Sequence, residues 1–283
     1  MRRPIGIFDS GLGGLTVVRA IRRRLPAESV VYFGDTARVP YGIKSRQTVT
    51  QFAVEDCEFL CRHDPKFIVV ACNTASAAAL PALRSRFSRP MYGVIEPGAR
   101  AAAAGWNGRP IGIIGTEATV ASGAYRKAIE RLLPTAQLVE KACPLLVPLV
   151  EEGRSAGDPI VRAVLAEYLE PLREAGVGSV VLGCTHYPLL KQGIAEVFGP
   201  GVALIDSAEV VAEEVAAELA RADLLAPDGE GGVQCFVSDH PQRFREVGAR
   251  FLGEPIDSVT LVSAEAFFGD SEAPVVGSEC DDP

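Results

Sequence analysis

The sequence predicts an α/β protein built from two related units, each with a mainly parallel sheet. Apolar segments of strand length alternate with segments of helix length along most of the chain. Two of the predicted strands end at a cysteine that is followed by two polar residues, and the strand–helix pattern restarts after Pro97. Ligands of parallel sheets gather at the carboxyl ends of the strands, so we expect a ligand site between the two units.

The first unit has predicted strands at residues 5–8, 30–33, 67–71 and 91–95, the last closed by Glu96-Pro97-Gly98. Helices are predicted at 15–25 and about 46–61, and directly after Cys72. The second unit has predicted strands at 111–114, 138–141, 180–184 and 202–205. Its helices are predicted at 99–104, about 118–133 and about 159–175, and residues 143–150 form an apolar segment broken by two prolines. Residues 106–109 are predicted as loop.

The last part of the chain is predicted to contain a helix at 208–221, a strand at 234–237, a helix at 241–251 and a strand near 258–262. From Gly269 onward the sequence is acidic and shows no periodicity, which predicts a disordered tail over 269–283.

Composition excludes several classes of function. The 283 residues are 48% hydrophobic, which is enough for a large buried core, and the net charge of −8 argues against a nucleic-acid partner. The sequence has no apolar run of the roughly 18–20 residues that cross a bilayer, and its N-terminus does not read as a secretory signal. Seven scattered cysteines, an odd number, indicate a reducing compartment, so we expect a cytoplasmic protein.

The two cysteine segments carry the functional prediction. FIVVACNTAS places Cys72 between a buried strand and a helix, and SVVLGCTHYPLL repeats this arrangement at Cys184. The helix N-terminus favours an anion, so we expect the pKa of each such thiol to lie below its usual value. A single cysteine of this kind would indicate a nucleophile, whereas a matched pair across a cleft indicates an acid and a base.

Two opposed thiols can remove a proton from one face of a carbon and return one to the other face, which is racemisation without a cofactor. Asp9 is the candidate assistant of Cys72, and His186 and Glu151 are the candidates for Cys184. The residues after each cysteine (Asn73, Thr74, Thr185 and His186) are expected to bind the carboxylate of a substrate at helix N-termini.

Longer motifs extend this pattern. In chain order they are DSGLGGLTV, GDTARVPYG, ACNTASA, IEPGA, IGIIGTEAT, ACPLLVPLVEEG and LGCTHYPLL. With these motifs the chain resembles the glutamate racemase family over about residues 5–268. It departs from the usual family pattern at Ser238-Asp239-His240 and in the acidic tail, and we expect both departures to concern only the outer face.

The resemblance implies two pseudo-symmetric, flavodoxin-like α/β domains with the active site in the cleft between them. It implies a first domain of residues 1–97 plus 208–268 and a second of 98–207. Cys72 and Cys184 would exchange the proton, assisted by Asp9, Glu151 and His186. The substrate would be held by Asp9, Ser10, Tyr41, Gly42, Asn73, Thr74, Thr116, Thr185 and His186. The resemblance further implies glutamate as substrate, no cofactor, no metal, D-glutamate for peptidoglycan synthesis, and a homodimer.

Other interpretations stay open at this point. Gly11-x-Gly13-Gly14 after a strand resembles part of a dinucleotide fingerprint, but Thr16 occupies the position of its third glycine. We therefore expect these glycines to form a tight turn or to admit a small carboxylate. A racemase for aspartate and a non-catalytic binding module are further alternatives. Glu152 competes with Glu151, and Cys57 and Cys61 share one helix face that is expected to pack in the core.

Overall fold

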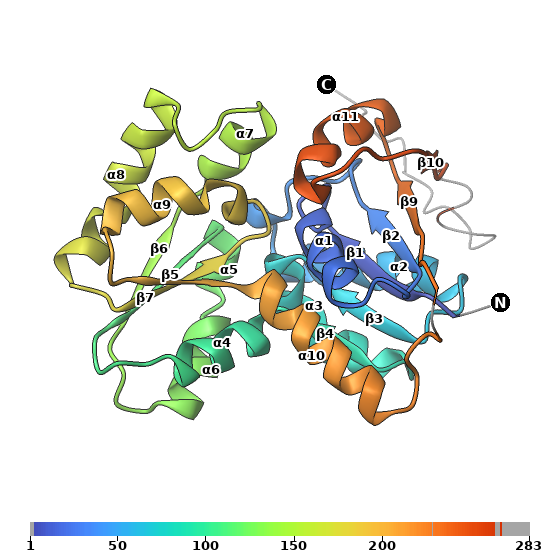
Figure 1. Cartoon of the computed structure of the whole chain (residues 1–283), viewed down its shortest axis with the longest axis horizontal. Helices are drawn as coiled ribbons and strands as arrows, with labels where there is room; N and C mark the ends of the chain where they lie inside the picture. The colour runs from blue at the N-terminus through green and yellow to red at the C-terminus, as the bar shows by residue number, and fades with distance from the viewer. Residues whose placement is uncertain (1–2, 228, 264–266, 268–283) are drawn as a thin grey trace, which may run out of the picture.

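The computed structural model describes residues 3–227, 229–263 and 267. Two lobes lie side by side in Figure 1, and each contains a sheet flanked by helices. One lobe is formed by the first part of the chain together with its last helix and strands, and the other by the middle of the chain. The predicted α/β fold with two parallel sheets is confirmed. The predicted tail at 269–283 lies outside the described residues.

The first sheet contains β1 (Ile5–Asp9), β2 (Val30–Gly34), β3 (Phe67–Val70), β4 (Met91–Gly93), β9 (Val233–Val237) and β10 (Val259–Leu261). Over the described residues its order is β10-β9-β2-β1-β3-β4, and its pairs are parallel. The C-terminal strands therefore return to the first sheet, where β9 pairs with β2.

The second sheet contains β5 (Ile111–Gly115), β6 (Leu138–Ala142), β7 (Ser179–Gly183) and β8 (Ala203–Asp206). Its order in the described chain is β6-β5-β7-β8, again with parallel pairs. The order β2-β1-β3-β4 of the first sheet thus recurs in the second. Cys72 follows β3 and Cys184 follows β7, which are equivalent strands in the two sheets.

The helices are α1 (Leu15–Arg24), α2 (Arg46–Cys61), α3 (Asn73–Arg86), α4 (Ile95–Ala104), α5 (Glu117–Ala121), α6 (Ala124–Leu132), α7 (Leu146–Glu151), α8 (Pro159–Glu174), α9 (Lys191–Phe198), α10 (Ser207–Arg221) and α11 (Pro241–Leu252). Two 3₁₀ helices, η1 (Tyr41–Ile43) and η2 (Tyr187–Leu190), lie beside the site described below. Helix α10 packs against both α1 and α4, so it contacts both lobes (Figure 1). The domain boundaries at residues 97 and 207 stay a prediction.

Burial explains why the strands form where they do. Every residue of β1, β2, β5 and β7 is buried, as expected for parallel strands that are covered by helices on both faces. These strands therefore appear as continuous apolar runs in the sequence rather than as alternating patterns.

Several predicted boundaries are wrong. Glu96, Pro97 and Gly98 do not close a strand but lie in the first turn of α4, where a proline costs no hydrogen bond because the first backbone N–H groups of a helix have no partner in it. The single helix predicted at 118–133 is divided into α5 and α6 at Gly123, whose φ of 61° is left-handed. The proline-bearing segment 143–150 contains the helix α7.

None of the helices in the described part of the chain is both long and apolar enough to cross a membrane.

Candidate active site

Cys72 and Cys184 line one cavity of about 340 Å³ at the carboxyl ends of the two sheets. Its walls come from the segment after β2, the starts of α3 and α5, helix α7 and the turn after β7. Of the predicted site residues, those that line it are Ser10, Tyr41, Gly42, Cys72, Asn73, Thr74, Thr116, Glu151, Cys184, Thr185 and His186. Residues that were not predicted as site residues also line it: Ile43, which lies outside the motifs, and Val39, Pro40, Glu117, Pro144, Val147 and Pro148, which lie within them.

Cys72 caps the N-terminus of α3. The backbone N–H of Ala75 donates to its Sγ across 3.4 Å, and the thiol donates to Ser10 Oγ at 3.6 Å. Burial, together with the charge of nearby Asp9, raises the pKa of Cys72 to about 12. The expectation that the helix N-terminus would lower this pKa is therefore wrong, because loss of solvation outweighs one backbone hydrogen bond.

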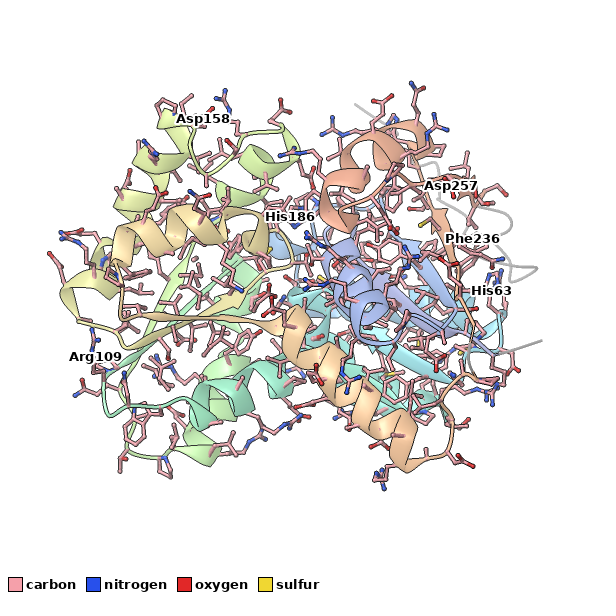
Figure 2. All side chains as sticks on the ribbon, viewed as in Figure 1. His63, Arg109, Asp158, His186, Phe236 and Asp257 are labelled. Atoms are coloured by element: carbon pink, nitrogen blue, oxygen red, sulfur yellow. The ribbon has the colours of Figure 1, made fainter. Side chains whose placement is uncertain are left out.

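Cys184 has a different environment. It is followed by a turn and then by η2, so the predicted helix N-terminus directly after this cysteine is wrong. Instead its Sγ lies 3.8 Å from Nδ1 of His186, which lies centrally in Figure 2. The imidazole also packs edge-on against Phe251 of α11, with 5.1 Å between ring centroids. The second cysteine therefore has an imidazole where the first has a helix N-terminus.

Glu151 holds the other side of His186. It is the last residue of α7, and its Oε1 lies 2.9 Å from His186 Nε2. Burial lowers the pKa of His186, but the hydrogen bonds to Cys184 and Glu151 outweigh it and raise that pKa to about 10. Although burial raises the pKa of Glu151, the contact with His186 lowers it overall. The imidazole is therefore a cation at neutral pH. Glu152 is exposed and does not line the cavity.

Asp9 is fully buried at the end of β1 and is not among the residues that line the cavity. Its Oδ2 accepts a hydrogen bond from the backbone of Gly11 at 3.1 Å, and its Oδ1 has no hydrogen-bond partner among the described residues. Burial raises the pKa of Asp9, while nearby His186 opposes this shift. Asp9 therefore acts on the thiol of Cys72 and on His186 through its charge, without lining the cavity.

A cluster of hydroxyl groups joins the two lobes at the cavity wall. Thr74 Oγ1, at the start of α3, lies 2.9 Å from Thr116 Oγ1 and 3.1 Å from Thr119 Oγ1. Thr116 caps α5 in the second lobe. The predicted binding residues Thr74 and Thr116 are thus brought together from opposite sheets.

The glycines after β1 admit neighbouring side chains. A methyl group at Gly13 would lie 2.2 Å from Thr185 Oγ1 and 2.5 Å from His186 Nδ1, which is closer than side chains approach. A methyl group at Gly14 would lie 2.6 Å from Asp9 Cβ. Gly13 is therefore needed for the close approach of Thr185 and His186 from the second lobe, and Gly14 for that of Asp9.

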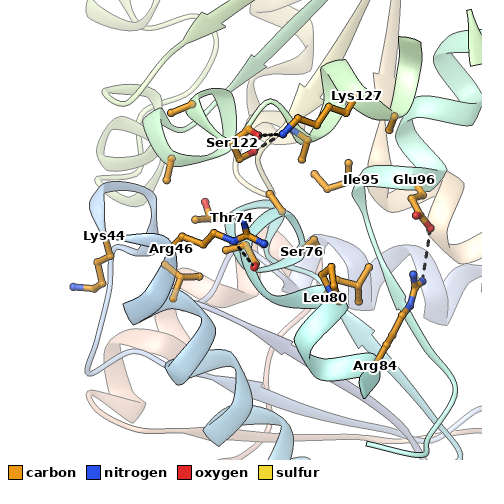
Figure 3. A pocket seen from close by; sticks show the side chains of 18 of the residues that line it. Lys44, Arg46, Thr74, Ser76, Leu80, Arg84, Ile95, Glu96, Ser122 and Lys127 are labelled. Atoms are coloured by element: carbon orange, nitrogen blue, oxygen red, sulfur yellow. Dashed lines mark hydrogen bonds and ion pairs between the residues drawn. The ribbon is translucent and has the colours of Figure 1, made fainter. Parts of the chain in front are cut away.

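A larger cavity of about 620 Å³ lies along α3 (Figure 3). Basic side chains line it, among them Lys44, Arg46 and Lys127, and neither Cys72 nor Cys184 does. Thr74 lines both cavities. Since the predicted proton-transfer groups converge on the smaller cavity, the candidate active site is placed there.

The fold and the site together define a class of protein: a two-lobed α/β enzyme with one cysteine from each sheet at a shared cavity. Residues 5–215 match the model of the Asp/Glu/Hydantoin racemase family. The chain belongs to this family, whose racemases are isomerases.

Individual relatives agree with this assignment. The chain is 54% identical to a glutamate racemase of Geobacter metallireducens over 93% of its own length and 98% of the relative's. It is similar in structure to a glutamate racemase isoform from Bacillus anthracis, with a TM-score of 0.89 and 40% identity over 93% of this chain and 98% of that one. It is also similar to a Francisella tularensis glutamate racemase solved with D-glutamate, with a TM-score of 0.86 and 36% identity over 93% and 98% of the two chains.

Proposed function

We propose that this protein is a cofactor-independent glutamate racemase that interconverts L- and D-glutamate by proton transfer at Cα. The observation that carries the proposal is that Cys72 and Cys184 follow equivalent strands of two sheets and line one cavity. The relatives named glutamate racemase, and the one solved with D-glutamate, support glutamate as the substrate. A cavity of about 340 Å³ accommodates a small amino acid.

The proposed reaction needs no redox partner. One cysteine, as a thiolate, takes the proton from Cα and becomes a thiol, while the electron pair of the C–H bond moves toward the α-carboxylate. The opposite thiol then donates its proton to the other face of Cα and becomes a thiolate. Since thiol protons exchange with water, the product carries a hydrogen from the solvent.

Neighbouring groups set which thiol carries a proton. His186, a cation at neutral pH with its Nδ1 3.8 Å from Cys184 Sγ, can donate a proton to the Cys184 thiolate and, once neutral, take it back from the thiol, while Glu151 fixes the imidazole. Asp9 is proposed to play the corresponding part for Cys72, because its charge acts on that thiol. The two cysteines thus have different assistants.

The remaining predicted residues are proposed to bind the substrate. Asn73 and Thr74 offer an amide and a hydroxyl at the start of α3, where backbone N–H groups favour a carboxylate. Thr185 and His186 face the same cavity from the second lobe. Ser10, Tyr41, Gly42 and Thr116 complete the walls.

The first test is optical. Purified protein incubated with L-glutamate in D₂O should lose the ellipticity of the amino acid and place deuterium at Cα, measured by circular dichroism and proton NMR. Cys72→Ala and Cys184→Ala should each abolish turnover. Cys143→Ala is the matched control, because this buried cysteine does not line the cavity and should leave turnover intact.

Other outcomes would contradict the proposal. Glutamate that keeps its optical activity and gains no deuterium would exclude the reaction, and a near wild-type rate in either cysteine variant would exclude the two-base scheme. A substrate panel in which aspartate alone is racemised would move the assignment to aspartate. Stabilisation by D-glutamate without exchange would indicate a binding module, and stabilisation by NAD or NADP would favour a nucleotide-binding oxidoreductase.

We further infer that the protein acts in the cytoplasm as a homodimer and supplies D-glutamate for peptidoglycan synthesis. Analytical ultracentrifugation tests the dimer. Depletion of the protein in its host tests the cellular role: growth should fail and should be restored by external D-glutamate.

A further inference from the structure

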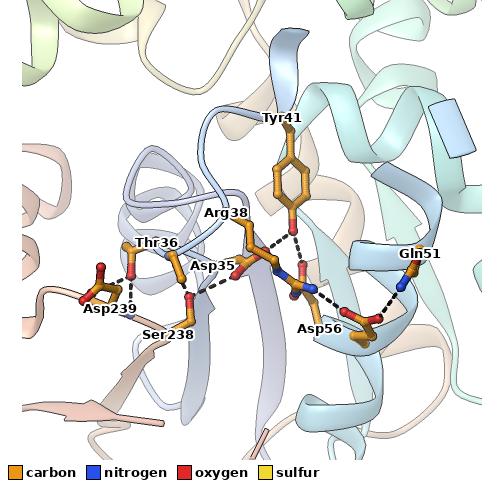
Figure 4. A network of polar contacts seen from close by, with 10 residues as sticks. Asp35, Thr36, Arg38, Tyr41, Gln51, Asp56, Ser238 and Asp239 are labelled. Atoms are coloured by element: carbon orange, nitrogen blue, oxygen red, sulfur yellow. Dashed lines mark hydrogen bonds and ion pairs between the residues drawn. The ribbon is translucent and has the colours of Figure 1, made fainter. Parts of the chain in front are cut away.

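A cluster of charged residues (Figure 4) surrounds the hydroxyl of Tyr41, a residue that lines the candidate active site. Arg38 contacts three carboxylates: its Nε lies 2.6 Å from Asp35 Oδ2, its Nη2 lies 3.0 Å from Asp56 Oδ1, and its Nη1 bonds Glu55. Asp35 and Asp56 are fully buried. The proton-transfer scheme uses none of these residues.

The cluster contacts the cavity through Tyr41. This side chain is almost fully buried, and its hydroxyl is hydrogen-bonded to Asp35 Oδ2 and lies 3.0 Å from Asp56 Oδ2 (Figure 4). Tyr41 belongs to five consecutive residues, 39–43, that line the cavity. Two of these residues, Val39 and Ile43, are exposed, so the segment is fixed from its buried side.

The same segment spans the gap between the lobes. At Gly42 a methyl group would lie 2.8 Å from Thr116 Cβ, so the backbone of η1 is in close contact with the start of α5. Movement of Tyr41 would therefore change both the cavity wall and the contact between the lobes.

The number of protons available around Tyr41 bears on the form of Asp56. The hydroxyl of Tyr41 has one proton, yet it lies at hydrogen-bond distance from two carboxylate oxygens. If that proton goes to Asp35, the contact with Asp56 requires a proton on Asp56 itself. The surplus of three carboxylates over one guanidinium favours this, and burial raises the pKa of Asp56 well above its ordinary value.

The segment after β9 also contacts the cluster. Ser238, which follows β9, donates a hydrogen bond from Oγ to Asp35 Oδ1 at 2.9 Å and accepts one from the backbone of Ala37 at the same distance. The expectation that the departure from the family pattern at 238–240 concerns only the outer face is therefore wrong for Ser238.

We propose that Asp35, Arg38 and Asp56, the last as a neutral carboxylic acid, are positioning residues that fix Tyr41 and so set the shape of the substrate cavity. This inference rests on the proposed racemase function. It assigns no proton transfer at Cα to these residues. Their effect is expected on substrate binding, through the segment 39–43.

The test compares three variants with one control. Asp56→Asn keeps both a donor for Tyr41 and an acceptor for Arg38, so its KM for glutamate should stay within about twofold of wild type. Asp56→Ala and Tyr41→Phe each remove a hydrogen bond to the cluster and should raise KM about tenfold, with a smaller change in kcat. Glu58→Ala is the control, because Glu58 lies on α2 like Asp56 but its carboxylate is exposed and pairs with Arg86 outside the cluster.

Infrared spectroscopy detects the carboxyl proton of Asp56 directly. The wild-type spectrum at neutral pH should contain a protonated carboxyl band that disappears in Asp56→Asn. Tyr41→Phe keeps the test informative if Asp56→Ala does not fold, because it preserves the aromatic ring.

The proposal is overturned if Tyr41→Phe has a wild-type KM, if Asp56→Asn raises KM as much as Asp56→Ala, or if the infrared band is unchanged. A wild-type protein that does not exchange the Cα proton of glutamate refutes the racemase proposal instead, and the infrared result still decides the form of Asp56.

Discussion

The phenol of Tyr125 donates a hydrogen bond to Oδ1 of Asn73, with 2.7 Å between the two oxygens. Tyr125 lies on α6 in the second lobe, whereas Asn73 begins α3 in the first, so this bond joins the lobes behind the cavity. Ser207 Oγ lies 3.0 Å from the same phenol oxygen. Because the amide oxygen of Asn73 is occupied, its NH₂ group is the part left to bind an anionic substrate.

Tyr125→Phe should therefore weaken substrate binding. Loss of one buried hydrogen bond, worth about 1 kcal/mol, should raise KM for glutamate about fivefold and change kcat less. Steady-state kinetics in both directions check this. Tyr92→Phe is the control, since this partly exposed tyrosine lies on β4 away from the cavity and its variant should behave as wild type.

Gly13→Ala should inactivate the enzyme. The added methyl group cannot coexist with Thr185 and His186 at their present positions, so the turn that carries Cys184 must move. A displacement of about 1 Å can cost about 100-fold in rate, and we expect a loss of at least this size. Gly232→Ala is the matched control, because its methyl group would meet no atom within 4 Å. Equal activity of the two variants would show that the turn can move freely.

Glu151→Gln should lower the pKa of His186. In the wild type this pKa is raised from 6.5 to about 10, so the protonated imidazole contributes stability that is complete below about pH 6.5 and is lost as pH rises through about 10. The pKa of Glu151 is lowered from 4.5, so its contribution is present above that pH and is lost as pH falls below it.

The difference in melting temperature between wild type and Glu151→Gln should consequently be largest near neutral pH and should shrink toward both extremes. Imidazole NMR resonances measure the pKa of His186 directly. The exposed neighbour provides the control, and Glu152→Gln should leave that pKa unchanged. An unchanged pKa in Glu151→Gln would show that Glu151 does not hold the imidazolium.

Lys66→Met should destabilise the fold without a specific effect on the chemistry. Lys66 Nζ lies 2.6 Å from Glu28 Oε2, and both side chains are buried. Removing the lysine leaves a buried carboxylate unpaired, at a cost of about 3–5 kcal/mol in the free energy of unfolding. Urea denaturation measures this cost, and turnover per folded molecule should stay constant. Arg86→Met, which breaks an exposed ion pair with Glu58, should cost less than about 1 kcal/mol.

The sequence predicts best what short segments determine. The repeated strand–cysteine pattern correctly predicts β3, β7 and two mainly parallel sheets, because continuous apolar runs before a turn indicate buried parallel strands. Glu96-Pro97-Gly98 is wrongly predicted to end a strand, although it lies in the first turn of α4. Gly98 is there to allow close contact with Tyr125 and Ser207, and this reason cannot be predicted because both residues are distant in the sequence. The raised pKa of Cys72 cannot be predicted from the sequence, because the burial of this thiol depends on how the two lobes pack.

Asp56 and Tyr125, which surround the site, are hard to predict from the sequence. Asp56 lies on the same buried face of α2 as Val49, Ala53 and Leu60, and a carboxylate at such a position indicates a buried polar partner. Tyr125 gave no signal of this kind, because a tyrosine on the buried face of an amphipathic helix is ordinary. Its contact with Asn73 follows only from the placement of one lobe against the other.

The unequal surroundings of Cys72 and Cys184 have a thermodynamic consequence under the proposed function. L- and D-glutamate are mirror images with equal free energy in water, so the equilibrium constant for their interconversion is unity. The Haldane relationship then requires kcat/KM to be equal in the two directions, however different the helix N-terminus beside one thiol and the imidazolium beside the other. The asymmetry can appear only in kcat and KM separately, and the enantiomer with the lower KM must have the lower kcat.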